Sequence, residues 1–320
     1  MCKKFFNFFI VLSLFNFIGC GSENPKPKPQ PKPLPLPRPK PKPKPKPKPL
    51  PKNPKPERKS CVLEGESFDE NGSYRFQVRK VGRINVYEPI TDGKCTRPIY
   101  SHSNGTGSRS IFYTPQLTRM ASHGFLAVSF ESTNTGSGVQ SLQAVEWALS
   151  QDMIEPKVAF GGHSQGGGSA AAAHFLAQKK YGDSLQIISI LEEPAFGMNR
   201  QGFALELPQL RGSTFVIHGS RDAIVPKSWV ARGARLLAND HYWYEAVGAT
   251  HINVRPWAAA GTVSFAKWKF YAMADAENYF LELMPSSRYW KAVEISPKAN
   301  GFSPDLEYDL ILREEYELYR

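Results

Sequence analysis

The stretch that decides the fold is GGHSQGGG, residues 161–168. It follows an apolar run of β-strand composition, KVAFGG at 157–162, and precedes an alanine-rich run at 169–180 that favours a helix. A serine in the pattern G-x-S-x-G, set between a strand and a helix, sits on a sharp turn with its hydroxyl exposed. The glycines leave room where strand and helix approach each other. We therefore take Ser164 as the candidate nucleophile, against the alternative of a glycine-rich or phosphate-binding turn with an incidental serine.

A serine hydroxyl needs a base to remove its proton, and the base needs a carboxylate to orient it. In this setting the acid follows the serine in the chain and the histidine comes last. Asp222 in HGSRDAIVP and His251 in GATHINV fit that order, and each follows a predicted strand. Ligands bind at the carboxyl ends of the strands in open α/β sheets. We expect Ser164 to attack an acyl carbonyl, His251 to carry the proton to the leaving group, and Asp222 to fix the imidazole tautomer.

Other residues compete for these roles. Glu192 and Glu193 lie at the end of the predicted strand 185–194, one strand before the strand that Asp222 follows. They are the alternative for the role of the acid. His163 is adjacent to the serine, but neighbouring side chains at such a turn point apart, so we expect it to pack. His218 lies on a predicted strand, where a buried structural histidine is expected.

The oxyanion of a tetrahedral intermediate needs N–H donors. One is expected from the backbone of Gln165, directly after the nucleophile, and the other from the small-residue loop YSHSNGTGS at 100–108. In that loop Asn104 is the first choice and Thr106 the alternative. The helix that begins after the serine also favours negative charge at its N-terminus.

Beyond residue 60, short apolar runs alternate with helical patterns. This alternation predicts an α/β fold with a mostly parallel sheet and helices on both faces. The predicted strands are 72–82 and 83–90 as a hairpin, then 97–104, 124–132, 157–162, 185–194, 213–220 and 241–247. The predicted helices are 139–149, 169–180, 226–238 and a long closing helix at 264–283.

The formal net charge of +11 on the 320 residues belongs to one segment. Residues 25–59 carry 13 Lys or Arg and one acidic residue, whereas residues 60–320 carry 25 basic and 27 acidic residues. The globular part is nearly neutral, so composition gives no case for a nucleic-acid partner.

Residues 1–19 predict an export signal. Lys3 and Lys4 precede an apolar run at 5–18 that is too short for a permanent bilayer span and fits a signal peptide. The run ends in FIGC, which resembles the bacterial lipobox, so we expect cleavage before Cys20 and acylation of that cysteine. The alternative is an ordinary secretory signal with a chance cysteine. Acylation would anchor the chain to the membrane of a bacterial cell envelope, at the outer membrane or the cell surface.

Residues 20–59 predict an extended tether. The segment 25–56 holds 16 prolines, mostly alternating with lysine, which excludes helix and sheet and favours polyproline II. It would reach roughly 100 Å at the polyproline rise per residue. We expect a spacer between membrane and domain, and contact with anionic cell-wall polymers is the alternative.

Two cysteines remain in the domain, Cys61 and Cys95. In an oxidising compartment they can pair, and the closed loop would contribute roughly 3–4 kcal/mol. Two free thiols are the alternative. The domain itself is expected to span 60–285, with 286–320 as a C-terminal extension.

The motifs IYSHSNGTG, RMASHGFLAVSFES, GGHSQGGG, HGSRDAIVP, GATHINV and SFAKWKFYAMADAENYFLEL follow one another over residues 86–283. In this order they resemble the α/β-hydrolase superfamily, and within it secreted dienelactone-hydrolase-like, chlorophyllase-like and cutinase-like polyester-hydrolase esterases. The resemblance implies an α/β-hydrolase fold and a Ser–His–Asp carboxylic-ester hydrolase that forms an acyl-enzyme and needs no metal or other cofactor. Polyester hydrolases usually carry Met where this chain has Gln165, and an aromatic residue where it has Ala195. The resemblance therefore implies ester hydrolysis in general.

Three other functions stay open. The polar loop 134–137 would suit a sugar, which favours a carbohydrate or cell-wall deacetylase. A peptidase of the same fold has the same triad. A non-catalytic surface lipoprotein would use the fold as a binding module. An apolar acyl group would instead be lined by aromatic side chains, namely Phe112, Tyr113, Phe196, Trp229, Trp243 and Trp257.

Overall fold

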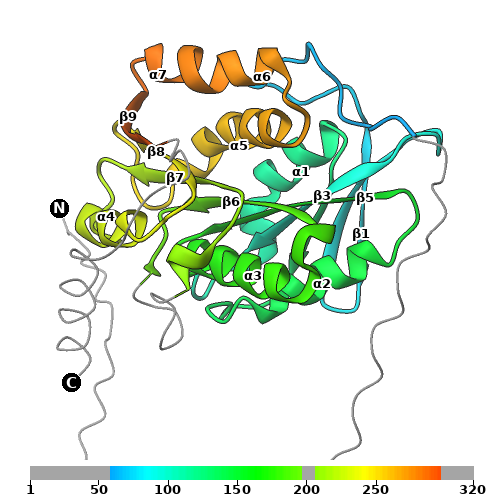
Figure 1. The fold of residues 1–320 in the computed structure, drawn as a ribbon, viewed down its shortest axis with the longest axis horizontal. Coiled ribbons are helices and arrows are strands. Elements are labelled where there is room, and N and C mark those ends of the chain that lie inside the picture. The colour runs from blue at the N-terminus through cyan, green and yellow to red at the C-terminus, as the bar shows by residue number, and fades with distance from the viewer. Residues whose placement is uncertain (1–57, 197–205, 297–320) are drawn as a thin grey trace, which may run out of the picture. The chain divides into compact units, whose positions relative to one another are not determined.

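The computed structural model describes residues 58–196 and 206–296 (Figure 1). Their centre is one nine-stranded sheet in the order β1-β2-β4-β3-β5-β6-β7-β8-β9. The six strands from β4 to β8 in this order run parallel, and β1, β2 and β9 are antiparallel to their neighbours. The strands are β1 (Phe76–Val81), β2 (Ile84–Pro89), β3 (Arg97–Ser103), β4 (Leu126–Phe130), β5 (Ile154–His163), β6 (Gln186–Glu192), β7 (Ser213–Gly219), β8 (Asp240–Ala246) and β9 (Trp290–Ser296).

Helices cover both faces of the sheet (Figure 1). One face packs against α2 (Val139–Leu149), α3 (Gln165–Tyr181) and α4 (Lys227–Arg235). The other packs against α1 (Thr114–Ser122), α5 (Val254–Tyr271) and α6 (Ala274–Asn278). Shorter helical turns are Ser110–Tyr113, Gly182–Ser184, Leu207–Gln209, the π-helical turn Tyr279–Leu283 and α7 (Met284–Ser286).

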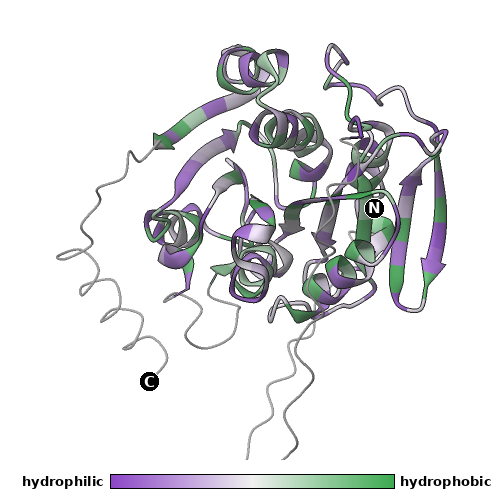
Figure 2. Ribbon diagram, turned by 45° about the vertical axis from the view of Figure 1, so that its right-hand side comes forward, coloured by the Kyte–Doolittle hydropathy of each residue, from purple (hydrophilic) through white to green (hydrophobic). Residues whose placement is uncertain are grey.

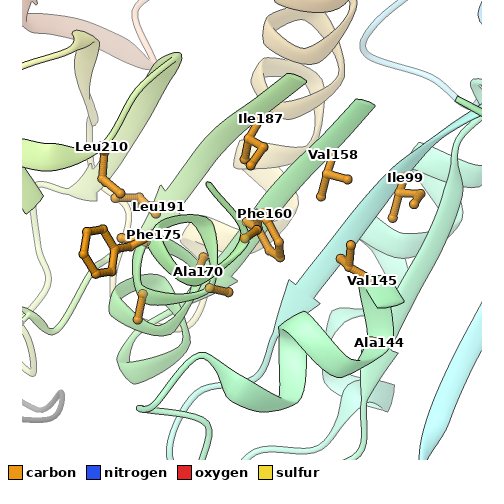
Figure 3. Close-up of a cluster of buried hydrophobic side chains, with 14 of the residues drawn as sticks. Ile99, Ala144, Val145, Val158, Phe160, Ala170, Phe175, Ile187, Leu191 and Leu210 are labelled. Atoms are coloured by element: carbon orange, nitrogen blue, oxygen red, sulfur yellow. The ribbon is translucent and has the colours of Figure 1, made fainter. Parts of the chain in front are cut away.

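The core has one layer on each side of the sheet because side chains alternate along a strand. Ile187 on β6 packs with the layer under α3, and Ile188 packs with the layer under α5. Figure 3 shows the first layer, where Phe160 and Leu191 of the sheet meet Ala170 and Phe175 of α3. Hydrophobic and hydrophilic residues alternate along the outer hairpin β1–β2, whose first strand is largely exposed (Figure 2). The central strands are buried on both faces, as parallel strands under two helical layers must be.

The predicted α/β class and all eight predicted strands are confirmed. Three features differ from the prediction. The closing helix begins at Val254 and breaks at Ala272, whose left-handed backbone (φ 52°) ends α5. Helix α1 has no counterpart in the prediction, although its buried residues Gln116, Leu117, Met120 and Ala121 recur at helical spacing. The sheet also continues beyond residue 285, since β9 pairs with β8.

A disulfide joins Cys61 to Cys95, as predicted. Beside it the chain forms an isolated parallel bridge between Ser60 and Thr96, in which the N–H of Cys61 donates to the carbonyl of Thr96 (2.8 Å). The bond therefore fixes the first described residues to the start of β3.

The predicted signal, Cys20 and the tether lie outside the described residues, as does most of the C-terminal extension. Within the described ranges, no helix has the length and apolar character to cross a bilayer.

A buried ion pair ties the N-terminal segment to α5. The ammonium of Lys267, fully buried, donates to Glu66 (2.6 Å) and to the carbonyl of Leu63 (2.7 Å). Glu66 also contacts His123 Nδ1 (2.9 Å). Burial disfavours the Glu66 carboxylate, but its hydrogen bonds with His123 and Lys267 hold its pKa well below its usual range. The Lys267 ammonium is fully buried and has no water to replace Glu66, so removing the carboxylate is costly.

We predict that Glu66→Ala lowers the free energy of unfolding by about 3 kcal/mol, because it leaves the Lys267 ammonium buried and unpaired. Urea denaturation of the purified protein measures this. Asp183→Ala is the control, since the side chain of Asp183 is 95% exposed and pairs with Arg211 at the surface; its effect should stay within about 0.5 kcal/mol. The double replacement Glu66→Leu with Lys267→Met should recover most of the loss. Equal effects of Glu66→Ala and Asp183→Ala would contradict a buried pair.

Candidate active site

Ser164 stands on a strained turn between β5 and α3. Its backbone has φ 59° and ψ −127°, a conformation that non-glycine residues rarely adopt. The N–H of Ser164 donates to the carbonyl of Glu192 on β6 (2.9 Å), and its own carbonyl accepts from Gly167 (2.8 Å) and Ala195 (3.0 Å). These bonds hold the turn in place from both sides, so the strain is built into the packing of the sheet.

The glycines around Ser164 are required by close backbone approach. A Cβ at Gly162 would lie 2.1 Å from the carbonyl oxygen of Gly166, and a Cβ at Gly166 would lie 2.1 Å from that of Ser103. A Cβ at Gly167 would lie 2.9 Å from Cα of Pro194. Contacts of 2.1 Å to backbone leave no room for any side chain. The composition of residues 161–168 therefore has a steric cause: strand, turn, helix and the loop after β3 meet at this point.

His251 and Asp222 are brought together as the chain order predicts. Nδ1 of His251 is 2.7 Å from Oδ2 of Asp222. The other carboxylate oxygen accepts from the N–H groups of Ile224 (2.7 Å) and Val225 (2.9 Å). The His251 ring lies against the ring of His163, with centroids 4.6 Å apart, and His163 directly precedes Ser164. All three predicted triad residues are thus at the same edge of the sheet.

The hydroxyl of Ser164 makes no hydrogen bond with any described residue. Ser164 is 8% exposed and His251 is 6% exposed. Hydrogen bonds between nucleophile and base are often long in the absence of substrate. The arrangement therefore has an oriented imidazole beside a buried turn, with the serine–histidine hydrogen bond not formed.

The Asp222 carboxylate is held ionised. Its side chain is fully buried, which opposes ionisation, but hydrogen bonds with His251 and with the N–H groups of Val225 and Ile224, together with the neutral Glu193, hold its pKa well below the usual range. An ionised acid at Nδ1 fixes the proton of His251 on that nitrogen. Nε2 is then the unprotonated atom that can accept a proton.

Glu193 lies beside Asp222 and is neutral. Burial, and then the adjacent Asp222 carboxylate, raise the pKa of Glu193 to about 10. Its Oε1 accepts from the N–H of Gly219 (2.5 Å), and its backbone has φ 47°, a second strained position at this edge. Glu193 was the alternative for the acid on sequence grounds. The structure places it behind Asp222, with no contact to His251 Nδ1, so it supports the carboxylate.

Glu192, the other alternative, faces the opposite side of the strand. It is fully buried, its Oε2 accepts from Gln116 Nε2 (2.5 Å), and burial raises its pKa to about 8. A buried neutral carboxyl of this kind cannot orient His251.

Among the described residues, Glu193, His218 and Asp222 form the one group whose spacing could suit a metal ion, with ligand atoms within 4.8 Å. His218 is buried, as predicted, with Nε2 3.9 Å from Glu193 Oε2. The chemistry of the set fits a metal poorly: Glu193 is protonated, and Asp222 is committed to His251 and two N–H groups. A carboxyl–carboxylate pair accounts for the geometry.

The loop after β3 lies against the serine. A Cβ on Gly105 would be 3.2 Å from Cβ of Ser164. The Asn104 side chain points into the protein, donating to the carbonyls of Phe130 (3.1 Å) and Ser132 (3.0 Å). The N–H of Gly105 donates to the hydroxyl of Tyr113 (2.9 Å) and so does not face the site. The backbone N–H groups of Asn104 and Thr106 therefore stay the two candidates for the second oxyanion donor. The N–H of Gln165, at the start of α3, stays the candidate for the other donor.

The sequence did not predict the contacts that two residues make at the site. His163 was expected to pack, but its Nε2 also lies 2.7 Å from the carbonyl oxygen of His251. Tyr113 was named only as a lining aromatic, yet its hydroxyl joins Gly105 to His163 Nδ1 (3.3 Å). No motif marks such contacts, because they depend on ring nitrogens and a hydroxyl meeting across three elements.

No protein-family model matches the chain, and no curated protein is significantly similar to it.

We predict that Glu193→Gln removes a pH dependence of stability. The pKa of Glu193 is about 10 in the folded chain against 4.5 for an ordinary glutamate. Between these values the folded chain keeps a proton that the unfolded chain releases, so stability falls as pH rises. Relative to Glu193→Gln, the wild type should lose up to ~1.4 kcal/mol per pH unit across this interval.

Urea denaturation at a series of pH values measures the difference between the two proteins. Glu64→Gln, at an exposed site, is the control and should follow the wild type. If the curves of wild type and Glu193→Gln ran parallel, Glu193 would be ionised in the folded chain and the neutral-acid assignment would be wrong.

Proposed function

We propose that this chain is a serine carboxylic-ester hydrolase with an α/β-hydrolase fold, acting through Ser164, His251 and Asp222 by way of an acyl-enzyme. The observation that carries the proposal is the 2.7 Å contact of His251 Nδ1 with an ionised, doubly N–H-bonded Asp222, beside a strained serine turn. Glu66 and His123 form a similar contact, but that carboxylate also binds the buried ammonium of Lys267. The contact of Asp222 with His251 instead adjoins the serine turn, and the burial of this carboxylate is offset by the bonds it makes to His251 and to two N–H groups.

The proposed steps assign a role to each of these residues. Nε2 of His251 takes the proton of Ser164 as its oxygen attacks the acyl carbonyl, and Asp222 stabilises the imidazolium that forms. The oxyanion is stabilised by backbone N–H groups at the start of α3 and in the loop 104–106. The ester C–O bond then breaks as His251 gives the proton to the leaving oxygen, which departs as the alcohol and leaves the acyl group on Ser164. Water, deprotonated by His251, attacks this acyl-enzyme, and the bond to Ser164 breaks to release the acid. The residues that suffice for this are all protein side chains and backbone, and we propose no cofactor.

The surroundings favour an apolar ester. Exposed apolar side chains adjoin the proposed triad: Ile252 follows His251 and is 56% exposed, and Ile224, whose N–H binds Asp222, is 61% exposed. Phe112 is 57% exposed, and Arg255 holds its carbonyl (3.1 Å) and that of Ile252 (2.9 Å). Tyr113 and Trp243, also expected to line an acyl site, are buried in the core.

In the polar loop 134–137, expected to suit a sugar, Asn134 is exposed but Thr135 is engaged within the protein. Thr135 is 1% exposed, and its hydroxyl donates to the carbonyl of Asn104 (2.7 Å) while its carbonyl accepts from Ser169 (2.6 Å). Its N–H donates to the Gln165 side chain (3.3 Å). These bonds brace the candidate oxyanion loop against α3, which weakens the case for a deacetylase.

We further propose that the enzyme is exported and anchored to the bacterial envelope by acylated Cys20, with the Pro/Lys segment as spacer. The disulfide between Cys61 and Cys95 supports export, because disulfides persist in oxidising compartments.

The test is release of p-nitrophenol from acetyl, butyryl and octanoyl esters by the wild type and by Ser164→Ala. We expect turnover that falls by at least roughly 10³-fold in Ser164→Ala. We also expect a fluorophosphonate to label the wild type at Ser164 only. A preference for butyryl or octanoyl over acetyl would follow from the apolar surroundings.

Equal turnover by both proteins would contradict the mechanism. Absence of both turnover and labelling in a folded, disulfide-bonded sample would favour a binding module. Faster cleavage of matched amides than of esters would favour a peptidase.

A further inference from the structure

A buried chain of three hydrogen bonds links the two loops that flank Ser164. The N–H of Gly105 lies 2.9 Å from the hydroxyl of Tyr113, which lies 3.3 Å from Nδ1 of His163. Nε2 of His163 lies 2.7 Å from the carbonyl oxygen of His251. Tyr113 is 0% exposed and His163 is 3% exposed, so water does not compete for these bonds.

The direction of every bond follows from the acceptor at one end. A carbonyl oxygen only accepts, so Nε2 of His163 carries the proton. Burial, and then the neighbouring His251, lower the pKa of His163 to about 3, so the ring is neutral and Nδ1 is an acceptor. The Tyr113 hydroxyl must then donate to Nδ1, and its oxygen accepts from Gly105. Ser108 also interacts with that oxygen. The chain thus has one consistent polarity.

The two ends of this hydrogen-bond chain lie at the candidate oxyanion loop and at the proposed base. Gly105 lies between Asn104 and Thr106, the candidates for the second oxyanion donor. His251 is the proposed base, and it is held by His163 twice, through its carbonyl oxygen and through ring contact at 4.6 Å. His163 itself is rigidly placed, because it ends β5 and precedes the strained turn.

We infer that His163 and Tyr113 are positioning residues that couple the oxyanion loop to the loop of the base. The inference rests on the proposed ester hydrolase function. This chain of hydrogen bonds from Gly105 through Tyr113 and His163 to His251, called the relay below, fixes the position of the His251 ring relative to Ser164 without touching substrate. Since a misplacement of about 1 Å at reacting groups costs on the order of 10²-fold in rate, loss of the relay should lower kcat while substrate binding stays unchanged.

Two variants of His163 separate its hydrogen bond from its bulk. His163→Phe keeps a ring against His251 and removes the donor. His163→Gln loses the ring but places an amide N–H near the position of Nε2. We expect kcat to fall about 10–100-fold in His163→Phe and about 5-fold or less in His163→Gln, with KM within about 2-fold in both.

Tyr113→Phe removes the middle of the relay, and we expect kcat to fall about 3–10-fold. Because the two residues act through one chain, Tyr113→Phe combined with His163→Phe should cost less than the product of the single losses. The matched control is Tyr100→Phe. Tyr100 is equally buried and its hydroxyl pairs with a histidine, His102 Nδ1 (3.0 Å). This hydrogen bond is not one of the three in the chain, and the pair meets the chain only by packing of the His102 ring on the Tyr113 ring (centroids 4.4 Å apart). Its kcat should stay within about 2-fold.

A second measurement needs no catalysis. Hydrogen exchange of the Gly105 amide, followed by NMR in the full chain, reports the far end of the relay. Exchange should be faster in Tyr113→Phe, and also in His163→Phe, because the His163 side chain reaches Gly105 only through the Tyr113 hydroxyl. It should be unchanged in Tyr100→Phe.

The inference is overturned if His163→Gln loses as much activity as His163→Phe, if Tyr100→Phe loses as much as Tyr113→Phe, or if His163→Phe leaves Gly105 exchange unchanged. Failure of the proposed function is distinct, since it would show as turnover independent of Ser164. In that case the exchange measurement alone still decides whether the two loops are coupled.

Discussion

The constraint on which this structure depends is the backbone crowding at residues 161–168. Four segments meet there with carbonyl oxygens so close that a single methyl group at Gly162 or Gly166 would lie 2.1 Å from one of them. The glycines permit this close approach of β5 and α3, and hydrogen bonds to Glu192, Gly167 and Ala195 hold Ser164 at its positive φ of 59°. The same approach brings the loop after β3 against the serine. A side chain at Gly162 or Gly166 would push these segments apart and move Ser164 away from the loop after β3 and from His251.

The buried ionisable groups of the protein are either neutral or paired with a partner. Asp222 is ionised, and the acid nearest to it, Glu193, is neutral, so the site holds one negative charge where two carboxyls meet. Glu66 and Lys267 neutralise each other under α5. His163 and His102 are neutral because burial lowers the pKa of each to about 3. The negative charge where these two carboxyls meet is thus on Asp222, which contacts the imidazole of His251.

Sequence reasoning reached the parts of this arrangement that local pattern and chain order determine. Apolar alternation located the strands, and the position of Asp222 and His251 after successive strands predicted their meeting. It failed where the outcome depends on contacts between distant residues. The break at Ala272 is one case, since KFYAMADAE at 269–277 has neither Gly nor Pro to end a helix, yet Ala272 takes a left-handed backbone. The roles of Glu193, Tyr113 and His163 are others, because each depends on which atom of a buried side chain meets which neighbour.

The disulfide near the start of the domain has a mechanical consequence. Cys61 is bonded to Cys95, two residues before β3, and β3 lies inside the sheet between β4 and β5. A pull on the chain ahead of Cys61 is therefore transmitted by a covalent bond to an interior strand. The segment from Val62 to the hairpin carries none of that load, so the outer strands β1 and β2 are not peeled away first. A domain held by its N-terminal side against flow or friction would yield only when this interior strand is drawn out.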